Sequence, residues 1–573
     1  MLFKCFRPFL LIFLLLIPHT APAEQAPLPE DGGFMVSAAH ELAAGAGREI
    51  LAEGGSAVDA AIAVQMVLTL VEPQSSGIGG GAFMLHWSAE DGKLEAYDGR
   101  ETAPAYVRPE HFLNEAGKPM AFRRAVLGGK SVGVPGVVAM LEMAHREHGN
   151  LPWARLFEPA IELAESGFPI SPRLHMLMQY LALAPDNLDA PAYFTDEAGK
   201  PLPVGHVLKN PALAKTLRRI AEHGAEAFYE GPVARAIAKR VRTAPVNAGA
   251  MTLEDLRGYE AVKREALCRP YRIWVVCGFP PPTSGGIAVL QILGMLERFD
   301  LASMKPISLK PVHLVAEASR LAYADRNLYV ADTDYIQVPV QGMLAKAYLK
   351  GRSALIDPER SMGKAEAGEP WKAPERAPDT SAEYPGTSHA SIVDADGNVV
   401  SITMTIETVF GSQLMAAGFL LNNELTDFAF KPMKKGRVVA NAPQPGKRPR
   451  SSMSPTIVFD KDKNPVFAIG SAGGSRIPLD VVNALIAVLD WKLPLDEAVA
   501  LPHHANRNGP TLLEKGTNIE ALKPALKERG HKVKIGETTS SLQGILLTED
   551  GLSGAADPRR EGAALGGVRE QAP

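Results

Sequence analysis

The sequence of 573 residues lacks several features that would each point to a class of protein. Its 60 Lys and Arg do not exceed its 64 Asp and Glu, so no basic field is available to attract nucleic acid. No apolar run reaches the roughly 20 residues that cross a bilayer. His145 and His148 do not have the H-E-x-x-H spacing of a zinc protease. We therefore expect no nucleic-acid partner, no stable membrane anchor, and no bound metal or cofactor.

Cysteine is scarce, with only three in the chain. Cys5 lies near the start, so Cys268 and Cys277 are the pair that remains, on either side of a strand-like segment at 271–276. In an exported protein an even pair can oxidise. A local disulfide is one interpretation of this pair, and two buried thiols are the other.

The first residues have the pattern of a secretory signal. Lys4 and Arg7 are basic, residues 9–17 form an unbroken apolar run, and residues 21–23 supply the A-x-A cleavage pattern. This pattern predicts a signal peptide over residues 1–23 and an exported protein, either periplasmic or secreted. A retained anchor is the alternative, although the apolar run is short for a bilayer span.

Two helices stand out in the remaining chain. Ser56 caps a helix whose first turn contains Asp59 and whose later residues, 60–71, are apolar on nearly every face, which indicates burial on all sides. A second apolar helix is predicted over 287–296. Between the glycine-rich turn at 77–81 and about residue 256, helical patterns dominate.

The composition changes before Thr387. Residues 353–385 contain five prolines, many charges and few large apolar side chains, which predicts an exposed and poorly packed linker ending at about residue 386. Strand patterns follow at 389–393 and 399–405, with a turn between them. Thr387 therefore stands at the leading edge of a predicted hairpin.

Short blocks of small, hydroxyl, acidic and glycine residues recur along the chain, and their order is informative. The blocks are 56–61 (SAVDAA), 77–81 (GIGGG), 100–104 (RETAP), 133–136 (GVPG), 280–286 (PPPTSGG), 386–389 (GTSH), 403–407 (TMTIE), 422–427 (NNELTD), 448–455 (RPRSSMSP), 470–476 (GSAGGSR) and 556–559 (ADPR). Each block alone is weak. Taken in order, they closely resemble the γ-glutamyltransferase family over essentially the whole mature chain.

The resemblance implies an α+β fold of the N-terminal-nucleophile hydrolase type, a four-layer αββα sandwich. It also implies self-cleavage between Gly386 and Thr387 into a large subunit, 24–386, and a small catalytic subunit, 387–573. The chemistry is consistent, because cleavage frees an α-amino group on the residue that carries the hydroxyl nucleophile. An α-amino group titrates at about 7.7–8.0 and can act as the base that a threonine hydroxyl needs.

The resemblance also assigns roles to other positions. Thr405 matches the threonine that hydrogen-bonds the nucleophile, and Gly473 and Gly474 match the oxyanion hole, where two backbone N–H groups approach the developing charge. An arginine can hold the α-carboxylate of a γ-glutamyl group, hydroxyl groups can assist it, and acids can hold the α-ammonium. The matching positions are Arg100, Ser451, Ser452, Glu424 and Asp427.

This sequence departs from the family pattern at two places. Glu407 stands where the best-known members carry an Asn that contacts the substrate amine, and it adds a negative charge beside Glu424 and Asp427. Residues 431–448, in the position of the family's lid loop, form a short segment without an aromatic residue. An open pocket would admit larger amides and more water.

The main hypothesis is therefore a γ-glutamyl amidase that acts on glutathione and related compounds by hydrolysis or by transfer to amino-acid or peptide acceptors. A related acylase with the same nucleophile, of the cephalosporin or glutaryl type, is the second hypothesis. A non-catalytic exported binding protein of this fold is the third, and self-cleavage distinguishes it from the other two.

Overall fold

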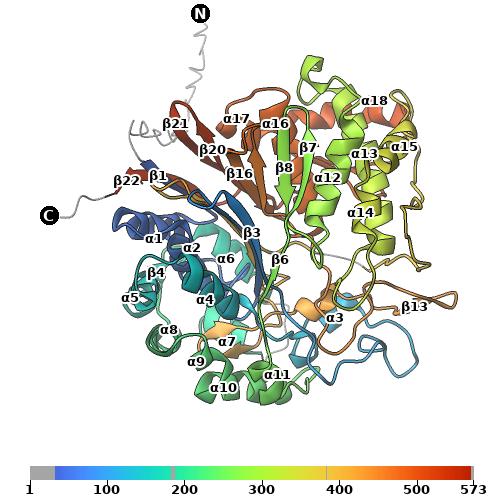
Figure 1. Cartoon of the computed structure of the whole chain (residues 1–573). Coiled ribbons are helices and arrows are strands. Elements are labelled where there is room, and N and C mark those ends of the chain that lie inside the picture. Colours follow the sequence, from blue (N-terminus) through green and yellow to red (C-terminus); the bar gives the residue numbers. More distant parts are fainter. Residues whose placement is uncertain (1–32, 182–187, 382–383, 570–573) are drawn as a thin grey trace, which may run out of the picture.

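The structure, a computed structural model, describes residues 33–181, 188–381 and 384–569, so the expected signal peptide lies outside the described residues. Two antiparallel sheets lie face to face, and helices cover both outer faces (Figure 1). The expected four-layer α+β sandwich is confirmed. In the part of the chain that is described, no helix combines the length and apolarity needed to cross a membrane.

The first sheet interleaves segments from before and after Thr387. Thr387 leads directly into β9, which pairs with β1 on one side and with β10 on the other. Strand β10 in turn pairs with β2. The seven strands, in sheet order, are β22 Ala563–Val568, β1 Gly33–Ala38, β9 Ser388–Val393, β10 Val399–Thr405, β2 Gly81–Ser88, β3 Lys93–Gly99 and β6 Val262–Arg264. The predicted hairpin after the linker is confirmed as β9 and β10.

The second sheet has six strands and packs against the first. In order these are β21 Gly551–Ala556, β20 Ser541–Thr548, β16 Pro465–Ala472, β15 Thr456–Phe459, β8 Trp274–Gly278 and β7 Leu267–Tyr271. Residues 271–276 are not one strand as expected, because Arg272 adopts a positive φ of 56° and turns the chain between β7 and β8. The resulting register places Cys268 opposite Cys277, and the two form a disulfide.

Helix α2, Ala57–Val71, shows how the sequence determines a core element. The Ser56 side chain accepts a hydrogen bond from the Asp59 N–H, and the Asp59 carboxylate accepts one from the Ser56 N–H, which forms a capping box. Every residue of the helix is buried. The predicted start, end and complete burial of this helix are confirmed.

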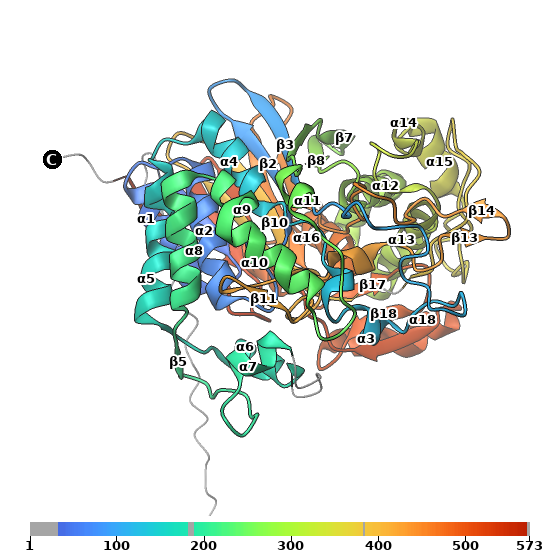
Figure 2. The same cartoon turned by 90° about the horizontal axis from the view of Figure 1, so that it is seen from below.

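The other main helices form the two outer layers. Those on the side of the first sheet are α1 Glu41–Ala52, α4 Val137–His148, α5 Glu158–Ser166, α8 Pro211–His223 and α10 Gly231–Arg242 (Figure 2). Those on the side of the second sheet are α12 Gly285–Leu296, α13 Leu309–Tyr329, α15 Lys346–Ala354, α16 Ile477–Leu489 and α17 Leu495–Ala500. The helix expected at 287–296 is confirmed as α12.

One expectation for the N-terminal half is wrong in part. The helical region after residue 81 begins with two strands, β2 and β3. Strand β2 is buried on both faces, between the helical layer and the second sheet, so its residues do not alternate between apolar and polar.

The segment before Thr387 is irregular, as its composition predicts. Between α15 and β9 the described residues form no helix or strand, and most of them are exposed or half-buried. Ala365, Ala377 and Asp379 are buried, however, and the Arg450 guanidinium donates to Asp379 at 3.0 Å. The linker therefore lies against the body of the protein and is better packed than its composition indicates.

Candidate active site

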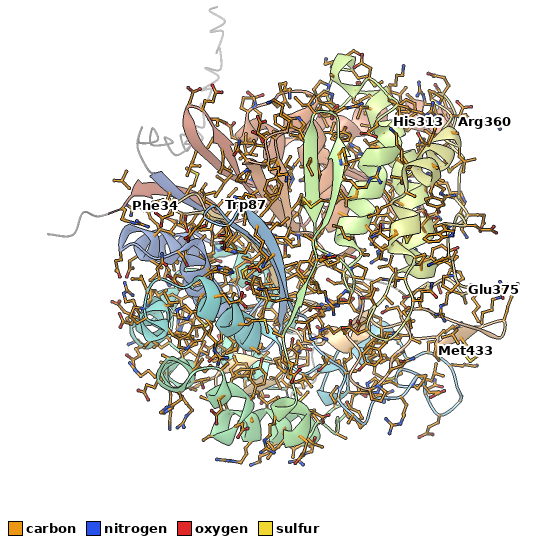
Figure 3. The ribbon with its side chains drawn as sticks, viewed as in Figure 1. Phe34, Trp87, His313, Arg360, Glu375 and Met433 are labelled. Carbon is orange, nitrogen blue, oxygen red and sulfur yellow. A yellow bond between two sulfur atoms is a disulfide. The ribbon has the colours of Figure 1, made fainter. Side chains whose placement is uncertain are left out.

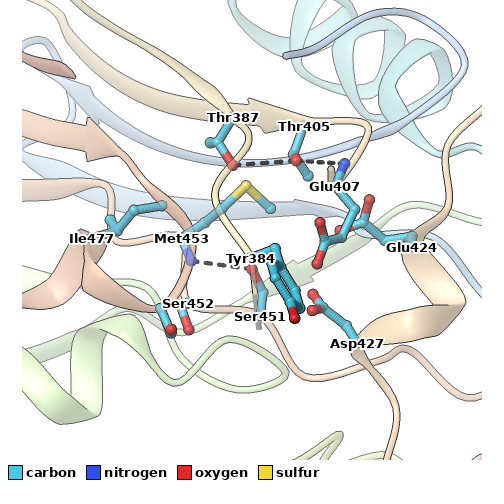
Figure 4. Close-up of a pocket in the computed structure, with 12 residues that line it drawn as sticks. Tyr384, Thr387, Thr405, Glu407, Glu424, Asp427, Ser451, Ser452, Met453 and Ile477 are labelled. Carbon is cyan, nitrogen blue, oxygen red and sulfur yellow. Dashed lines mark hydrogen bonds between the residues drawn. The ribbon is translucent and has the colours of Figure 1, made fainter. Parts of the chain in front are cut away.

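Thr387 lies at the junction of the linker and β9, where it is 4% exposed. Its hydroxyl donates to the Thr405 hydroxyl at 3.2 Å (Figure 4). Its N–H donates to the Ser75 carbonyl at 3.2 Å. The Thr405 hydroxyl also accepts a hydrogen bond from the Glu407 N–H at 2.8 Å. Two threonines at facing ends of one hairpin are therefore held together by side-chain and backbone contacts.

The backbone on both sides of this contact is constrained. Thr387 has φ of 92° and Glu407 has φ of 78°, a region that side-chain-bearing residues rarely occupy. A Cβ on Gly386 would lie only 1.6 Å from the Glu407 carbonyl oxygen, so no other residue fits there without a backbone shift. Such strain persists where the surrounding structure over-determines it, which is typical of functional sites.

The glycine pair after β16 faces the Gly386–Thr387 bond. The Gly473 N–H donates to the Gly386 carbonyl at 3.2 Å, and Gly473 and Gly474 have φ of 138° and 62°. A Cβ on Gly474 would lie 2.4 Å from the Tyr384 carbonyl oxygen. The Gly473 N–H is therefore placed against the Gly386 carbonyl as an oxyanion-hole donor would be.

Arg560 is a contact that the sequence analysis missed. Its Nη1 donates to the Thr387 carbonyl at 3.0 Å, and its Nε donates to the Thr539 carbonyl at 3.1 Å. Burial lowers the pKa of Arg560 to about 9. The block at 556–559 ends one residue before it, so only its position beside that block could have indicated a role.

Arg100 lies after β3 and is completely buried. Its Nη1 donates to the Glu424 carboxylate, its Nη2 donates to Asp427 at 2.6 Å, and its Nε donates to the Pro449 carbonyl at 3.0 Å. The sequence analysis assigned Arg100 to a substrate carboxylate and the two acids to a substrate ammonium. In this structure the three groups bind one another, because the 3₁₀ turn Glu424–Asp427 lies directly against the end of β3.

Glu407 completes a group of carboxylates at one end of the pocket. It is 6% exposed, and its Oε2 has no hydrogen-bond partner among the described residues. Burial, followed by repulsion from Asp427 and Glu424, raises the pKa of Glu407 well above its usual range. Burial also raises the pKa of Glu424 to about 7, against the opposing effect of Arg100. One carboxyl of the group therefore holds a proton at neutral pH.

Ser451 and Ser452 are held by hydrogen bonds from residues of the layer that covers the second sheet. Ser284 donates through both its N–H and its hydroxyl to the Ser451 carbonyl, at 2.9 and 2.7 Å. The Ser452 hydroxyl accepts from Arg326 at 2.7 Å, and the Ser451 hydroxyl accepts from the Met453 N–H at 3.1 Å. The rigid turn at 280–286 thus supports the residues that line the pocket.

A single pocket joins these groups. It is lined by Tyr384, Thr387, Thr405, Glu407, Glu424, Asp427, Ser451, Ser452, Met453, Gly474, Ser475 and Ile477. The sequence analysis did not identify Tyr384, Met453, Ser475 and Ile477. Arg100 and Gly473 lie behind the lining rather than in it.

Tyr384 supplies an aromatic ring to the pocket lining. It comes from the end of the linker and stacks on Phe122, with ring centroids 4.2 Å apart. The expected short lid segment forms an exposed hairpin, β13 Met433–Lys434 and β14 Arg437–Val438, and Met433 lies at the edge of the molecule (Figure 3). In the uncut chain the linker, and not this hairpin, borders the pocket.

Comparisons with known proteins identify the family of the chain. The chain is 39% identical to the glutathione hydrolase proenzyme of Escherichia coli K12 over 537 residues, 92% of this chain and 90% of the relative. It is 36% identical to the acylase ACY 1 proenzyme of Pseudomonas sp. SE83, over 96% of each chain. The cephalosporin acylase of Bacillus halodurans has the same fold, with a TM-score of 0.84, 27% identity and coverage of 97% of this chain and 99% of the other. Residues 43–567 match the family described as gamma-glutamyltranspeptidase, so this chain belongs to that family.

Proposed function

We propose that the chain is an exported γ-glutamyl amide hydrolase and transferase that acts on glutathione-like donors after cutting itself before Thr387. The observation that carries this proposal is the contact between the Thr387 and Thr405 hydroxyls beside a Gly386 carbonyl that accepts from Gly473. The glutathione hydrolase relatives support the choice of donor.

The self-cleavage step uses groups that are already adjacent. The Thr387 hydroxyl oxygen bonds to the Gly386 carbonyl carbon, the C–N bond breaks, and the hydroxyl proton moves to the released amine. Water then hydrolyses the ester and leaves a Gly386 carboxylate and a free Thr387 α-amine. The Gly473 N–H, which already donates to the Gly386 carbonyl at 3.2 Å, stabilises the oxyanion in this step.

Turnover repeats the same chemistry on a donor. The Thr387 α-amine accepts the hydroxyl proton, the oxygen attacks the donor's γ-carbonyl, and the leaving amine takes the proton away. Water or an acceptor amine then releases the acyl group. Because the hairpin at 433–438 does not cover the pocket, hydrolysis outruns transfer to amino-acid or peptide acceptors.

The related acylase activity is the second candidate, and the pocket charge favours it. Arg100 already binds Glu424 and Asp427, and Glu407 adds a third carboxyl near them. A glutaryl donor has no α-ammonium, so it needs neither Glu424 nor Asp427 as a partner and leaves their ion pairs with Arg100 intact. The acylase relatives are consistent with such a donor.

N-terminal sequencing and a donor panel on one purified sample test both candidates. We expect two fragments, one of 363 residues (24 to 386) and one of 187 residues (387 to 573), that together hydrolyse a γ-glutamyl anilide. Thr387→Ala remains uncut and inactive, whereas Thr387→Ser retains some cleavage. A single intact and active chain contradicts the mechanism, and a strong preference for a glutaryl anilide favours the acylase.

A further inference from the structure

A second group of titratable side chains lies on the helical side of the first sheet, away from Thr387. The register of β2 and β3 pairs His86 with Glu95, and His148 is the last residue of α4, which packs over these strands. One ring nitrogen of each histidine and one oxygen of Glu95 lie within 4.8 Å of one another. The His148 Nε2 is 2.8 Å from the Glu95 Oε2, and the centroids of the two imidazole rings are 4.0 Å apart, with the ring planes tilted by 32°.

His86 is the unusual member of this group. It is 2% exposed, and its Nδ1 has no hydrogen-bond partner among the described residues. A neutral imidazole is the form that binds metal ions, and an unpaired buried nitrogen requires a partner.

The chain contains a comparable cluster that lacks this feature. His313, Glu317 and His531 are also close together, but His313 uses both ring nitrogens, one with His531 at 2.7 Å and one with the Asp357 carbonyl at 2.8 Å. The Glu317 carboxylate accepts from Arg320 and from two groups of the linker. In this second cluster the ring nitrogens of His313 and the carboxylate of Glu317 already have hydrogen-bond partners, so they are not available to bind a metal ion.

The charges around Glu95 decide how easily a cation enters. Lys93 and Lys263 bind its Oε1 at 2.5 and 2.8 Å, while Tyr97 and His148 bind its Oε2. The two lysine side chains are 65% and 36% exposed, so they can turn into solvent when a cation arrives. The carboxyl end of α4 adds the negative end of a helix dipole.

We propose that His86, Glu95 and His148 form a binding site for one Zn²⁺ ion. Two imidazoles and a carboxylate are a ligand set that zinc takes in proteins, with ligand distances of about 2.0–2.2 Å. The Tyr97 hydroxyl, which already contacts His148 at 2.8 Å, lies next to the fourth position.

The role of this site is structural. Gly81, at the other end of β2, pairs with Thr405, so five residues of extended strand separate His86 from the end that faces the active site. At about 3.3 Å per residue the separation is roughly 17 Å. A zinc ion here would tie the end of α4 to the sheet and would take no part in the reaction, so binding and unfolding are the appropriate measurements.

The test uses the purified full-length protein without a polyhistidine tag. Metal is removed by dialysis against a chelator, and Zn²⁺ is titrated in competition with a chromogenic chelator while thermal unfolding is followed in parallel. We expect one Zn²⁺ per chain and a Tm that rises with Zn²⁺. His86→Asn and His148→Ala weaken binding by at least about tenfold. Lys263→Met removes a repelling charge and tightens binding by about threefold or more.

His223→Ala is the matched control, because its side chain is 63% exposed and lies on a different helix. It should bind Zn²⁺ as the unmodified protein does. The proposal fails if the unmodified protein binds no Zn²⁺, if His148→Ala binds it as tightly, or if Lys263→Met weakens binding. Should His86→Asn not fold, the other two variants decide, since His148 and Lys263 are only partly buried.

Discussion

The buried carboxyl of Glu407 makes the binding of an amine-bearing donor dependent on pH. In the free protein burial and the neighbouring acids raise the pKa of Glu407 well above its usual range, which favours the protonated form. A γ-glutamyl donor brings an ammonium group, which favours the ionised carboxylate. Binding should therefore release one proton from Glu407, and Glu407→Gln removes that proton without a large change of shape.

The size of the effect follows from proton linkage. Where binding releases one proton, the affinity rises tenfold for each pH unit until the pH passes the pKa of the free group, and tenfold corresponds to about 1.4 kcal/mol. The pKa of Glu424 is raised only to about 7, so this second carboxyl is largely ionised above that pH. As the pH rises above about 7, where Glu424 is largely ionised, the KM of the unmodified protein should fall by up to about tenfold per pH unit until Glu407 ionises in the free protein, and that of Glu407→Gln by less than about twofold.

The assay is a pH series of KM for a γ-glutamyl anilide and for a glutaryl anilide that lacks the α-amine. KM is the relevant parameter, because the Thr387 α-amine titrates in the same range and changes kcat. The glutaryl donor brings no ammonium, so neither protein should show the slope with it. Equal slopes for both proteins with the γ-glutamyl donor would refute proton release by Glu407.

Three further predictions test the rest of the site and the fold. Gly386→Ala should slow self-cleavage more than about a hundredfold on a gel time course, because its Cβ would lie 1.6 Å from the Glu407 carbonyl oxygen; normal cutting would show that this contact is absent before cleavage. Arg100→Lys loses the two-carboxylate pairing and should lower the free energy of unfolding by about 3 kcal/mol as well as raise KM; an unchanged Tm would contradict that pairing. Cys268→Ser opens a loop of about ten residues and should lower stability by about 2–3 kcal/mol in urea unfolding, an effect that a reductant should reproduce in the unmodified protein.

The sequence predicted those helices and strands whose signals, such as caps, turns and apolar runs, lie in adjacent residues. The cap at Ser56 and the apolar run after it predicted α2, and β-branched residues around a turn predicted β9 and β10. Strands β2 and β3 were not predicted, because strands covered on both faces lose the alternation that identifies them. Their burial depends on helices and strands that are distant in the sequence.

The active site was predicted as a set of residues but not as a set of contacts. The ordered blocks predicted that Thr387, Thr405 and the pair Gly473 and Gly474 share one site. In the structure Thr387 contacts Thr405, and Gly473 contacts Gly386. The pairing of Arg100 with Glu424 joins residues 324 apart in the chain, and no local spacing predicts which charges meet. Tyr384 was missed because its ring reaches the pocket only when the linker lies against the protein body.

Because strands from both sides of the proposed cleavage site alternate in the first sheet, the two fragments, 24–386 and 387–573, depend on each other for their fold. Strand β9, from the second fragment, lies between β1 of the first fragment and β10 of the second. Strand β22, also from the second fragment, pairs with the other edge of β1. Both large sheets contain strands from both fragments, so neither fragment alone can form either of them. Folding must precede cutting, and a cut pair that comes apart has no template for reassembly. Each molecule therefore keeps the partner with which it was synthesised, and mixing two differently labelled preparations should yield no hybrids.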